Sequence, residues 1–514
     1  MEKVKENRFP ILSIALILLS VGIFTTIVWR VFDFTVDDAF IFFRYSRNLA
    51  NGIGPTYNAV PPRVEGYTSF LWMLLMAVPH WLNIDAVLFS KVLGLLFTLF
   101  TFVTTYALVT QLYSVKENPR KNLPGIVVVF MSAAFAPTAV HAIAGMETGL
   151  FTFLLTAFTY AIVKGMEEEK YLKYVPFLGL LCGLSRPEGN LIVVILFAIA
   201  LWKMSKHLRR GFAKNILFTY FIPGCMYFLW RISYYSLLLP LPFYTKVTKQ
   251  SAFSGFPYVV GFILKVLPLV GVFLVFSLLK ADKKTGLVAM AILPLLLIYI
   301  YPRHIMGYDW RFLYPLIPML FALAGRGLAN ILFMVQSFYE VGRIKNLTMI
   351  GLILGICLIV GIISLEDIEV VLEEKQAYAA AMDGVYIPLG EILQAYPYEG
   401  PPPILAITDA GAIPYISQWE VIDINGYNDP VIATSGELQS EYILSRSPDL
   451  TILVSARSDD FVHDNERYLF YFEDFMEAGM ILLGNIEVAE DYYLWLLVDP
   501  DSQVTPYLWA TLRP

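Results

Sequence analysis

The feature that most constrains this chain is a series of long apolar runs that stops near residue 364. Of its 514 residues, 57% are hydrophobic and 16% are charged, whereas soluble domains carry about 25% charged residues. A helix needs about 20 mostly apolar residues to cross a bilayer. The surplus of apolar residues therefore predicts a polytopic α-helical membrane protein.

We predict about eleven transmembrane helices from the apolar runs. The first run is longer than the core of a signal peptide and lacks a small-residue cleavage site, so we expect a retained helix. Two other apolar segments, 67–82 and 256–265, are short, and we expect them to be re-entrant or interfacial. The predicted spans lie near 11–29, 86–113, 124–142, 149–164, 175–187, 190–203, 214–232, 266–280, 286–301, 312–332 and 347–364.

The charged residues divide the chain into two parts. Residues 1–364 hold 32 of the 37 Lys and Arg but 16 of the 43 Asp and Glu, and residues 365–514 hold the other 5 and 27. We predict a transmembrane domain over 1–364 and an acidic soluble domain over 365–514. Helical and strand patterns alternate in the second part, which favours a small α/β fold.

The distribution of Lys and Arg predicts the orientation in the membrane, because cytoplasmic connections are enriched in them. Alternate connections are basic, and together they hold 20 of the 32 basic residues of the first part. Placing these connections inside puts the N-terminus in the cytoplasm and the acidic domain outside the cell membrane.

The connections that then face outward carry ionisable residues. Such groups are costly near a bilayer and are kept paired or facing water. We therefore predict one polar cavity at the outer membrane face. Its candidate residues are Asp37, Asp38, Glu65, Glu147, Arg186, Glu188, Lys246, His304, Asp309 and Arg311.

Six ordered motifs carry a resemblance to a known family. They are DDAFIFFRYSRNLANGIGPTYN…RVEGYTSFLW, GMETGLF, SRPEG, LPFYTKV, GYDWRFLYPLIP and ITDAGAIPYIS…VIDINGYNDPVIA, in order from about residue 35 to 455. This set resembles the GT-C superfamily of lipid-dependent glycosyltransferases. Within that superfamily it is most similar to the mycobacterial terminal beta-arabinofuranosyltransferase group and its uncharacterised relatives.

The resemblance implies a GT-C fold and an inverting glycosyltransferase. Such enzymes take a hexosyl or pentosyl group from a polyprenyl-phosphate donor. They transfer it at the outer membrane face to a hydroxyl of a cell-envelope glycan, glycolipid or protein. The leading acid of the first outer loop acts as general base in the superfamily, which favours Asp37 over Asp38. The residues themselves leave open that this pair caps or begins the helix that follows.

Positive side chains are expected near the donor phosphate. Arg186, Lys246 and Arg311 are candidates, because Arg offers a planar fork for oxyanions and Lys a point charge. Arg44 could contact the phosphate or anchor the following amphipathic helix at lipid headgroups. Arg186 could instead pair with Glu188.

Other polar residues of these loops complete the predicted substrate site. Glu65 and Glu147 could bind sugar hydroxyls or form structural ion pairs, and Asp309 could orient Arg311. His304 is more typical of a structural hydrogen bond, and Tyr244 lies beside Lys246 in LPFYTKV.

Cofactors are not clearly indicated. A divalent cation (Mg, Mn or Ca) at Asp37 and Asp38 is left open, because hard cations favour oxygen ligands. The three cysteines are read as core thiols. Partners would be the lipid-linked donor, the acceptor and the bilayer, without nucleic acid. A transporter or a non-enzymatic membrane protein with an external sensory domain are the alternatives, but the chain shows no internal repeat.

Overall fold

The computed structural model describes residues 8–113, 122–248, 253–279, 281–302, 306–338, 342–434, 439–463 and 470–512. The chain forms two compact units, each assembled from separate stretches of sequence. The helical unit comprises Met1–Asp33, Ser90–Tyr227 and Ala252–Lys375. The mixed unit comprises Phe34–Phe89, Phe228–Ser251 and Gln376–Pro514. Three helices, α4, α11 and α16, have residues in both units.

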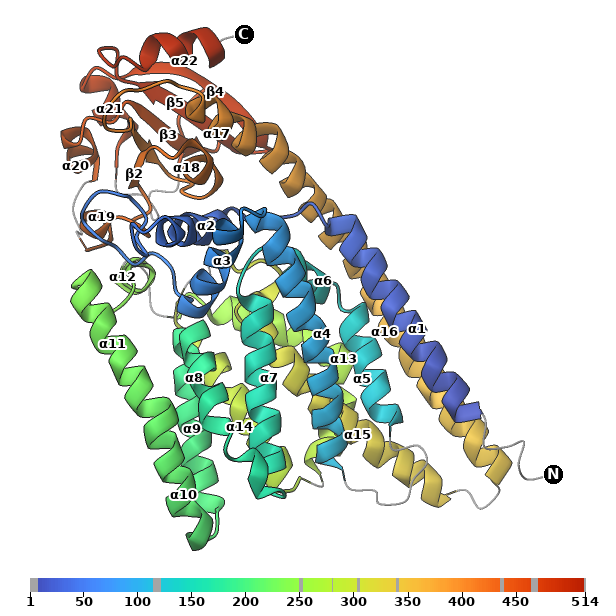
Figure 1. Ribbon diagram of the computed structural model, residues 1–514. Coiled ribbons are helices and arrows are strands. Elements are labelled where there is room, and N and C mark those ends of the chain that lie inside the picture. The colour runs from blue at the N-terminus through green and yellow to red at the C-terminus, as the bar shows by residue number, and fades with distance from the viewer. Residues whose placement is uncertain are drawn as a thin grey trace. The chain divides into compact units, whose positions relative to one another are not determined.

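Helices build the helical unit (Figure 1). They are α1 (Arg8–Val31), α4 (Ala86–Leu112), α5 (Leu123–Ala134), α6 (Ala136–Ile143), α7 (Thr148–Gly165), η1 (Glu169–Tyr171), α8 (Val175–Ser185), α9 (Pro187–Lys203), α10 (Lys206–Ile216), η2 (Leu217–Phe221), α11 (Ile222–Tyr235), α13 (Phe256–Leu278), α14 (Lys283–Ile298), η3 (Tyr308–Trp310), η4 (Tyr314–Leu316), α15 (Ile317–Phe338) and α16 (Gly342–Ala381).

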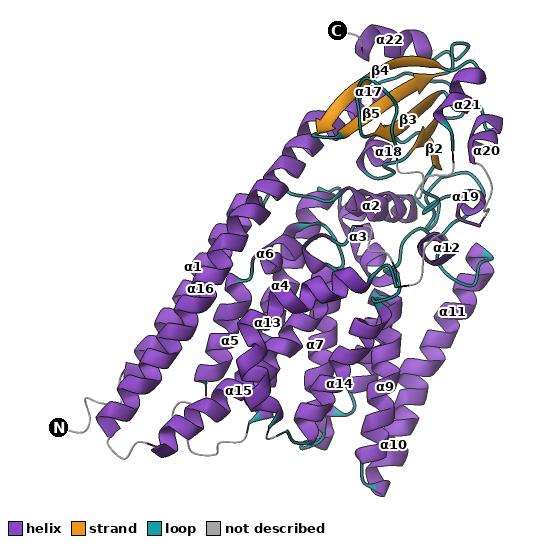
Figure 2. Cartoon of the chain, turned by 180° about the vertical axis from the view of Figure 1, so that it is seen from behind, coloured by secondary structure: helices purple, strands orange, loops and turns teal. Residues whose placement is uncertain are grey.

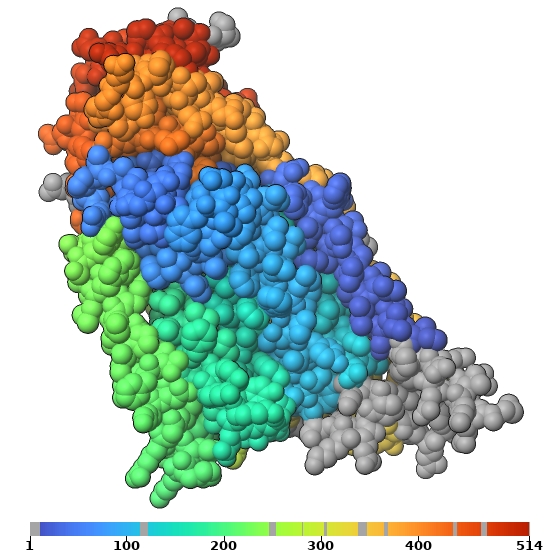
Figure 3. All heavy atoms as spheres, viewed as in Figure 1, coloured from blue at the N-terminus to red at the C-terminus, as the bar shows by residue number. Residues whose placement is uncertain are grey.

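Apolar helices long enough to cross a membrane confirm a multi-pass membrane protein. Among the described residues, seven helices meet the length and hydropathy that a span requires, or eight if α5 and α6 form one bent span. The bend of 66° between α5 and α6 comes at Phe135, just before Pro137, because proline lacks the amide hydrogen that would continue the helix. Figure 3 shows α1 and α4 at the surface, where they expose side chains such as Leu18 and Val103.

Several predicted spans differ from the observed helices. The interfacial segment predicted over 256–265 is wrong, because α13 runs unbroken through it and forms one apolar helix of 23 residues. Pro257 occupies the first turn of α13, where proline is tolerated because no amide partner is lost. The spans expected at 175–187 and 190–203 are helices α8 and α9, of 11 and 17 residues. The segment at 67–82 contains α3 (Phe70–Leu82), which is 13 residues long and shorter than a span needs.

Glycines allow close helix packing in the helical unit. A side chain at Gly94 of α4 would meet the main chain of Ala142, and one at Gly327 of α15 would meet the Phe273 carbonyl of α13. Small residues at such crossings let helix backbones approach closely in membranes. Helix α1 lies beside part of the longer α16 in both views (Figures 1 and 2), and Arg30 pairs with Glu369 at 3.0 Å between them.

The mixed unit combines helices with one five-stranded sheet (Figure 2). The strand order is β2-β1-β3-β5-β4, with β1 parallel to β2 and β3, and β5 antiparallel to β3 and β4. Its elements are α2 (Asp37–Ala50), α3, α12 (Leu241–Thr248), the end of α16, η5 (Met382–Tyr386), α17 (Ile387–Gln394), β1 (Ile404–Ile407), α18 (Ala412–Ser417), β2 (Glu420–Asp423), α19 (Pro430–Thr434), α20 (Gln439–Ser445), β3 (Leu450–Ser455), α21 (Phe472–Glu477), β4 (Ile481–Ala489), β5 (Tyr492–Val498) and α22 (Thr505–Leu512).

The α/β fold predicted for the acidic part is confirmed, and the antiparallel hairpin of β4 and β5 is an addition to it. One core cluster joins strand residues such as Ala406 and Leu453 with Ile443 of α20 and Phe475 of α21. The two strands of the hairpin are separated only by Glu490 and Asp491, a spacing that indicates a two-residue turn. The domain division expected at residue 364 stays a prediction. In the compact units, residues 34–89 group with the C-terminal part.

The crossing of α13 and α15 generates a stability prediction. Gly327→Ala should lower stability by about 1–3 kcal/mol, the usual cost of overpacking, because the new methyl group meets the Phe273 carbonyl. Gly351→Ala on α16 is the matched control, because open space surrounds that position. The thermal unfolding midpoint of the purified protein in one detergent measures both. Equal midpoints for the two variants would contradict close packing at Gly327.

Candidate functional site

The two acids of the first loop begin helix α2. Asp37 and Asp38 occupy its first turn, and Val36 is the N-cap residue, without a side-chain cap. Acids in the first turn of a helix are favoured by the helix dipole. Neither Asp is the N-cap residue. Of the structural alternatives for the pair, only a favourable interaction with the helix dipole therefore remains.

Asp37 is held by the C-terminal part of the mixed unit. Its Oδ1 accepts a hydrogen bond of 2.7 Å from the main-chain N–H of Ala412, and its own N–H donates to the Tyr378 hydroxyl at 2.9 Å. A Cβ on Gly411 would collide with the Asp37 carboxylate, so glycine is required for this approach. Asp37 is nearly buried, whereas Asp38 is half-buried.

Burial raises the pKa of Asp37 well above its ordinary value, and the negative charges of Asp409 and Asp38 raise it further. The Ala412 amide opposes this shift only in part. Asp409 is itself fixed by the hydroxyls of Tyr386 and Tyr492, each at 2.7 Å. A carboxylate with a raised pKa is a stronger proton acceptor, which suits a general base near neutral pH.

Arg44 follows Asp37 by about two turns on the same face of α2, and its side chain is buried. Its Nε donates to the Tyr57 carbonyl at 2.8 Å, and its terminal nitrogens donate to the carbonyls of Pro414 and Trp419 and to Asn58 Oδ1. The helix is enclosed by the mixed unit, so a role of Arg44 as a lipid-headgroup anchor is not supported. Its contact with substrate stays a prediction.

Glu65 forms a buried ion pair with Arg231, a partner that the sequence analysis did not name. Its Oε2 lies 2.5 Å from Nε of Arg231, and its carbonyl accepts from the N–H of Leu241 at the start of α12. Burial raises the pKa of Glu65 to about 7, although the Arg231 guanidinium opposes the shift. This favours the structural alternative for Glu65. Helix α12 also carries Tyr244 and Lys246, and the Lys246 side chain lies outside the described residues.

Four of the predicted residues meet in the helical unit. Glu147 Oε1 accepts from Arg186 Nη1 at 3.1 Å and from Arg311 Nη2 at 3.2 Å. Arg186 Nε also donates to Glu188 at 2.6 Å, and the Tyr299 hydroxyl bonds to both partners of that pair. The ends of α7, α8, α9, α14 and the segment before α15 thus converge on one charged cluster, which we call the arginine cluster.

Asp309 lies beside this cluster in a strained backbone. Met306, Asp309 and Trp310 have positive φ of 59°, 45° and 60°, which is unfavourable for residues with a Cβ and is concentrated at functional sites. The Asp309 carboxylate pairs with Lys375 Nζ at 2.9 Å, and its carbonyl bonds to His141 Nε2 at 2.9 Å. The predicted His304 lies outside the described residues.

The sequence motifs missed Arg231, Tyr299, Lys375 and Asp409. Arg231 and Lys375 are isolated charges in or beside apolar helices. Because a charge near lipid is costly and therefore rare, their positions in the sequence are a signal that could have identified them. Nothing in the local sequence marks Tyr299. Asp409 lies in the motif ITDAGAIPYIS but was not among the residues named for the site.

A divalent cation at the acid pair is poorly supported. Among the described residues, no group of three or more His, Cys, Asp or Glu side chains could hold a metal ion. The Ala412 N–H points at the Asp37 carboxylate, and such a donor competes with a cation for the same oxygen.

The INGYNDP loop of the C-terminal part is held by hydrogen bonds within the loop and to its neighbours. Asp423 accepts from the main-chain N–H groups of Asn425 and Asn428, each at 2.9 Å. Asp429 accepts from Val431 and from the Tyr442 hydroxyl. These bonds shape the INGYNDP turn. Burial raises the pKa of Asp423 to about 7.

Comparisons with known proteins bear on the fold. A family model described as "Domain of unknown function (DUF8728)" matches residues 374–505. No curated protein matches the chain in sequence.

Solved structures resemble the whole chain. ArnT from Cupriavidus metallidurans bound to undecaprenyl phosphate is similar over 95% of this chain and 98% of its own, with a TM-score of 0.61 and 12% identity. The apo oligosaccharyltransferase of Archaeoglobus fulgidus is similar over 88% and 70%, with a TM-score of 0.55 and 10% identity. At these identities the likeness concerns the fold. The chain has the GT-C fold with a small C-terminal sheet domain, and the finer resemblance to the arabinofuranosyltransferase group stays a prediction.

Proposed function

We propose that the chain is an inverting glycosyltransferase. It takes a sugar from a polyprenyl-phosphate donor and transfers it to a hydroxyl of a cell-envelope glycan, glycolipid or protein at the outer face of the cell membrane. The observation that carries the proposal is the likeness over nearly the whole chain to a structure with bound undecaprenyl phosphate. Multiple apolar helices and a raised-pKa carboxylate directly after the first span support it.

The reaction assigned to this site is a single displacement. The acceptor oxygen forms a bond to the anomeric carbon while the bond from that carbon to the phosphate oxygen breaks, which inverts the configuration. The polyprenyl phosphate leaves with the bonding electrons, and the acceptor proton passes to a carboxylate. Asp37 is the proposed base, because its Oδ1 is anchored by Ala412 and a carboxylate has further lone pairs to accept a proton.

Charge on the departing phosphate requires positive partners. Arg186 and Arg311 of the arginine cluster and Lys246 are the proposed ones. Glu147 and Glu188 hold the two guanidinium groups in fixed orientation, which reduces the reorganisation needed when phosphate binds. Asp309 orients the segment that carries Arg311. Substrate contacts of Arg44, Tyr244 and His304 complete the proposal, and they rest on the motif resemblance alone.

Loss of the base tests the function. Asp37→Asn should lower transfer by about 10²–10⁴-fold, the usual contribution of a general base, while the protein still binds donor lipid. The assay follows transfer from lipid-phosphate sugars that co-purify with the protein and are identified by mass spectrometry.

Asp33→Asn is the matched control, because Asp33 is an exposed carboxylate four residues earlier. Full activity of Asp37→Asn would transfer the role to Asp38. Full activity of the Asp37→Asn, Asp38→Asn double variant would overturn the mechanism.

The pH dependence of transfer tests the role of Asp409. Its negative charge raises the pKa of Asp37, and the base acts only when ionised. Asp409→Asn should therefore move the acidic limb of the kcat/KM profile to lower pH, whereas the exposed-residue variant Asp460→Asn should leave it unchanged. Asparagine can still accept a hydrogen bond from Tyr386 or Tyr492. An acidic limb that stays at the same pH or moves to higher pH in Asp409→Asn would contradict this coupling.

The proposed orientation is tested by labelling single cysteines in intact cells. In a variant without Cys182, Cys225 and Cys357, Glu490→Cys in the β4–β5 turn should react with a membrane-impermeant reagent. Lys206→Cys at the start of α10 should react only after lysis. The reverse pattern would invert the topology.

A further inference from the structure

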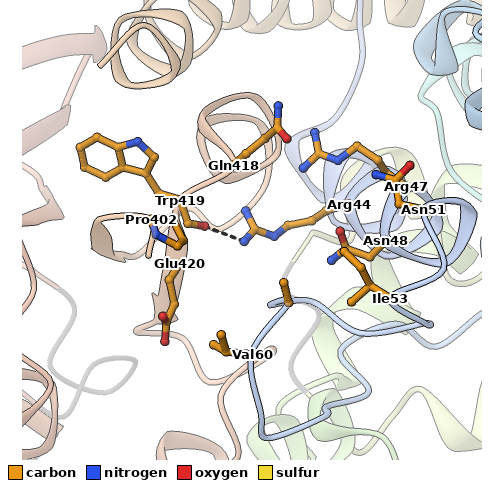
Figure 4. Close-up of a pocket in the computed structure, with 11 residues that line it drawn as sticks. Arg44, Arg47, Asn48, Asn51, Ile53, Val60, Pro402, Gln418, Trp419 and Glu420 are labelled. Carbon is orange, nitrogen blue, oxygen red and sulfur yellow. Dashed lines mark hydrogen bonds between the residues drawn. The ribbon is translucent and has the colours of Figure 1, made fainter. Parts of the chain in front are cut away.

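A pocket of about 170 Å³ lies within the mixed unit, between the second half of α2 and the start of β2 (Figure 4). This volume holds on the order of ten water molecules, so it suits one sugar ring better than a longer chain. Its lining residues are Arg44, Arg47, Asn48, Asn51, Ile53, Ala59, Val60, Pro402, Gln418, Trp419 and Glu420.

Two arginines, Arg44 and Arg47, bring positive charge to the pocket. Arg44 is buried, and its partners are three main-chain carbonyls and the Asn58 amide. Arg47 is half-buried, donates to the Tyr415 carbonyl at 2.7 Å and stacks on the Tyr415 ring. Neither guanidinium forms an ion pair with a carboxylate of the described residues. Buried charges are normally paired, so this pair of cations favours an anionic ligand.

The carboxylate that lines the pocket is already paired with another arginine. Glu420 Oε1 lies 2.7 Å from Nη2 of Arg446. The surrounding acidic part, residues 365–514, has 5 basic and 27 acidic residues. The two cations of α2 therefore lie beside a part of the chain in which acidic residues predominate.

Arg47 retains the capacity to bind such a ligand. A guanidinium has five N–H donors, of which the Tyr415 carbonyl takes one. Stacking on the ring fixes the plane of the group, as bidentate recognition of a carboxylate or phosphate requires. In Figure 4 the Arg44 and Arg47 side chains extend from α2 toward Trp419 and toward Glu420, the first residue of β2.

Amide groups around the two arginines can serve sugar hydroxyls. Asn48 Nδ2 donates to the carbonyls of Thr56 and Tyr57, which leaves Oδ1 as an acceptor at the wall. Asn51 and Gln418 are exposed at the rim. Gln418 holds a left-handed φ of 62°, a strained conformation for a residue with a Cβ. Anion donors beside neutral amides are what an acidic sugar needs.

The pocket is remote from the carboxylate pair. Asp37 and Asn48 are eleven residues apart on α2, and at 1.5 Å per residue this is about 16 Å along one face of the helix. We propose that the pocket binds an acidic sugar residue, bearing a carboxylate or phosphate, of an extended glycan acceptor. The role as acceptor subsite rests on the proposed transferase function, and it makes the acceptor an anionic oligosaccharide instead of a small molecule.

Direct binding tests the inference without turnover. The full-length protein in lipid nanodiscs, carrying Asp37→Asn and without added donor, is titrated calorimetrically with a glucuronate-containing oligosaccharide and with a glucose oligosaccharide of equal length. The acidic probe should bind at least tenfold more tightly. Equal affinities would overturn the inference. Because no transfer is measured, this result does not depend on whether the enzyme assignment is correct.

Two pocket variants and one control locate the binding. Arg47→Gln removes the charge, and Asn51→Asp adds a negative charge at an exposed position with the same side-chain shape. Each should lower the affinity for the acidic probe at least tenfold and change the affinity for the neutral probe by less than twofold. Arg457→Gln, an exposed arginine paired with Asp459 in the same domain, should change neither. Unchanged affinity in Asn51→Asp, a variant that keeps the packing of Arg47, would overturn the site.

Competition with inorganic phosphate tests the sugar assignment, and the transfer assay tests the role as acceptor subsite. Phosphate should displace the acidic probe only at far higher concentration, and phosphate that binds as tightly as the oligosaccharide would overturn the sugar assignment. In the enzyme with Asp37 intact, Arg47→Gln should raise KM for an acidic acceptor at least tenfold with kcat nearly unchanged. Loss of kcat with unchanged KM would overturn the acceptor subsite.

Discussion

A carboxylate buried against a main-chain amide is the contact on which the mixed unit depends. Asp37 Oδ1 accepts a hydrogen bond from the N–H of Ala412. About two turns further along α2, Arg44 donates to the carbonyls of Pro414 and Trp419. A loop near the N-terminus and a sheet domain near the C-terminus are thereby one compact unit. These charged groups are costly to bury, so removing either partner would leave the other without compensation. The C-terminal part is thus a structural component of the candidate site and more than an appended soluble domain.

The same burial sets the chemistry proposed for the site. Loss of solvation and the charge of Asp409 raise the pKa of Asp37, which turns a weak base into one suited to accept a proton from a hydroxyl. In the helical unit the opposite arrangement holds. Arg186 and Arg311 share Glu147, so these cations are held in place by carboxylates. Asp37 is therefore buried beside other acids, whereas the guanidinium groups of Arg186 and Arg311 are buried beside a carboxylate of opposite charge.

Some of the residues named from the motifs meet in the structure, because each lies next to a helix end that the sequence marks. Glu147, Arg186, Glu188 and Arg311 come from three loops of the sequence, and they form one cluster. The interfacial segment at 256–265 was wrong, because Lys265 was taken as a boundary although α13 continues through it. Arg231, Tyr299 and Lys375 could not be assigned, since each gains its role from a partner more than 60 residues away in sequence.

By itself the sequence determined that the chain crosses a membrane repeatedly, that an acidic α/β part follows, and that polar residues gather in a few loops. Hydropathy and charge are properties of local segments, so these features can be read without a structure. Only the tertiary structure decided that Asp37 meets Ala412, that Glu65 is taken by Arg231, and that Arg44 and Arg47 line a pocket with β2. Those outcomes depend on which segments pack together, and burial, which sets both pKa and pairing, exists only after they have packed.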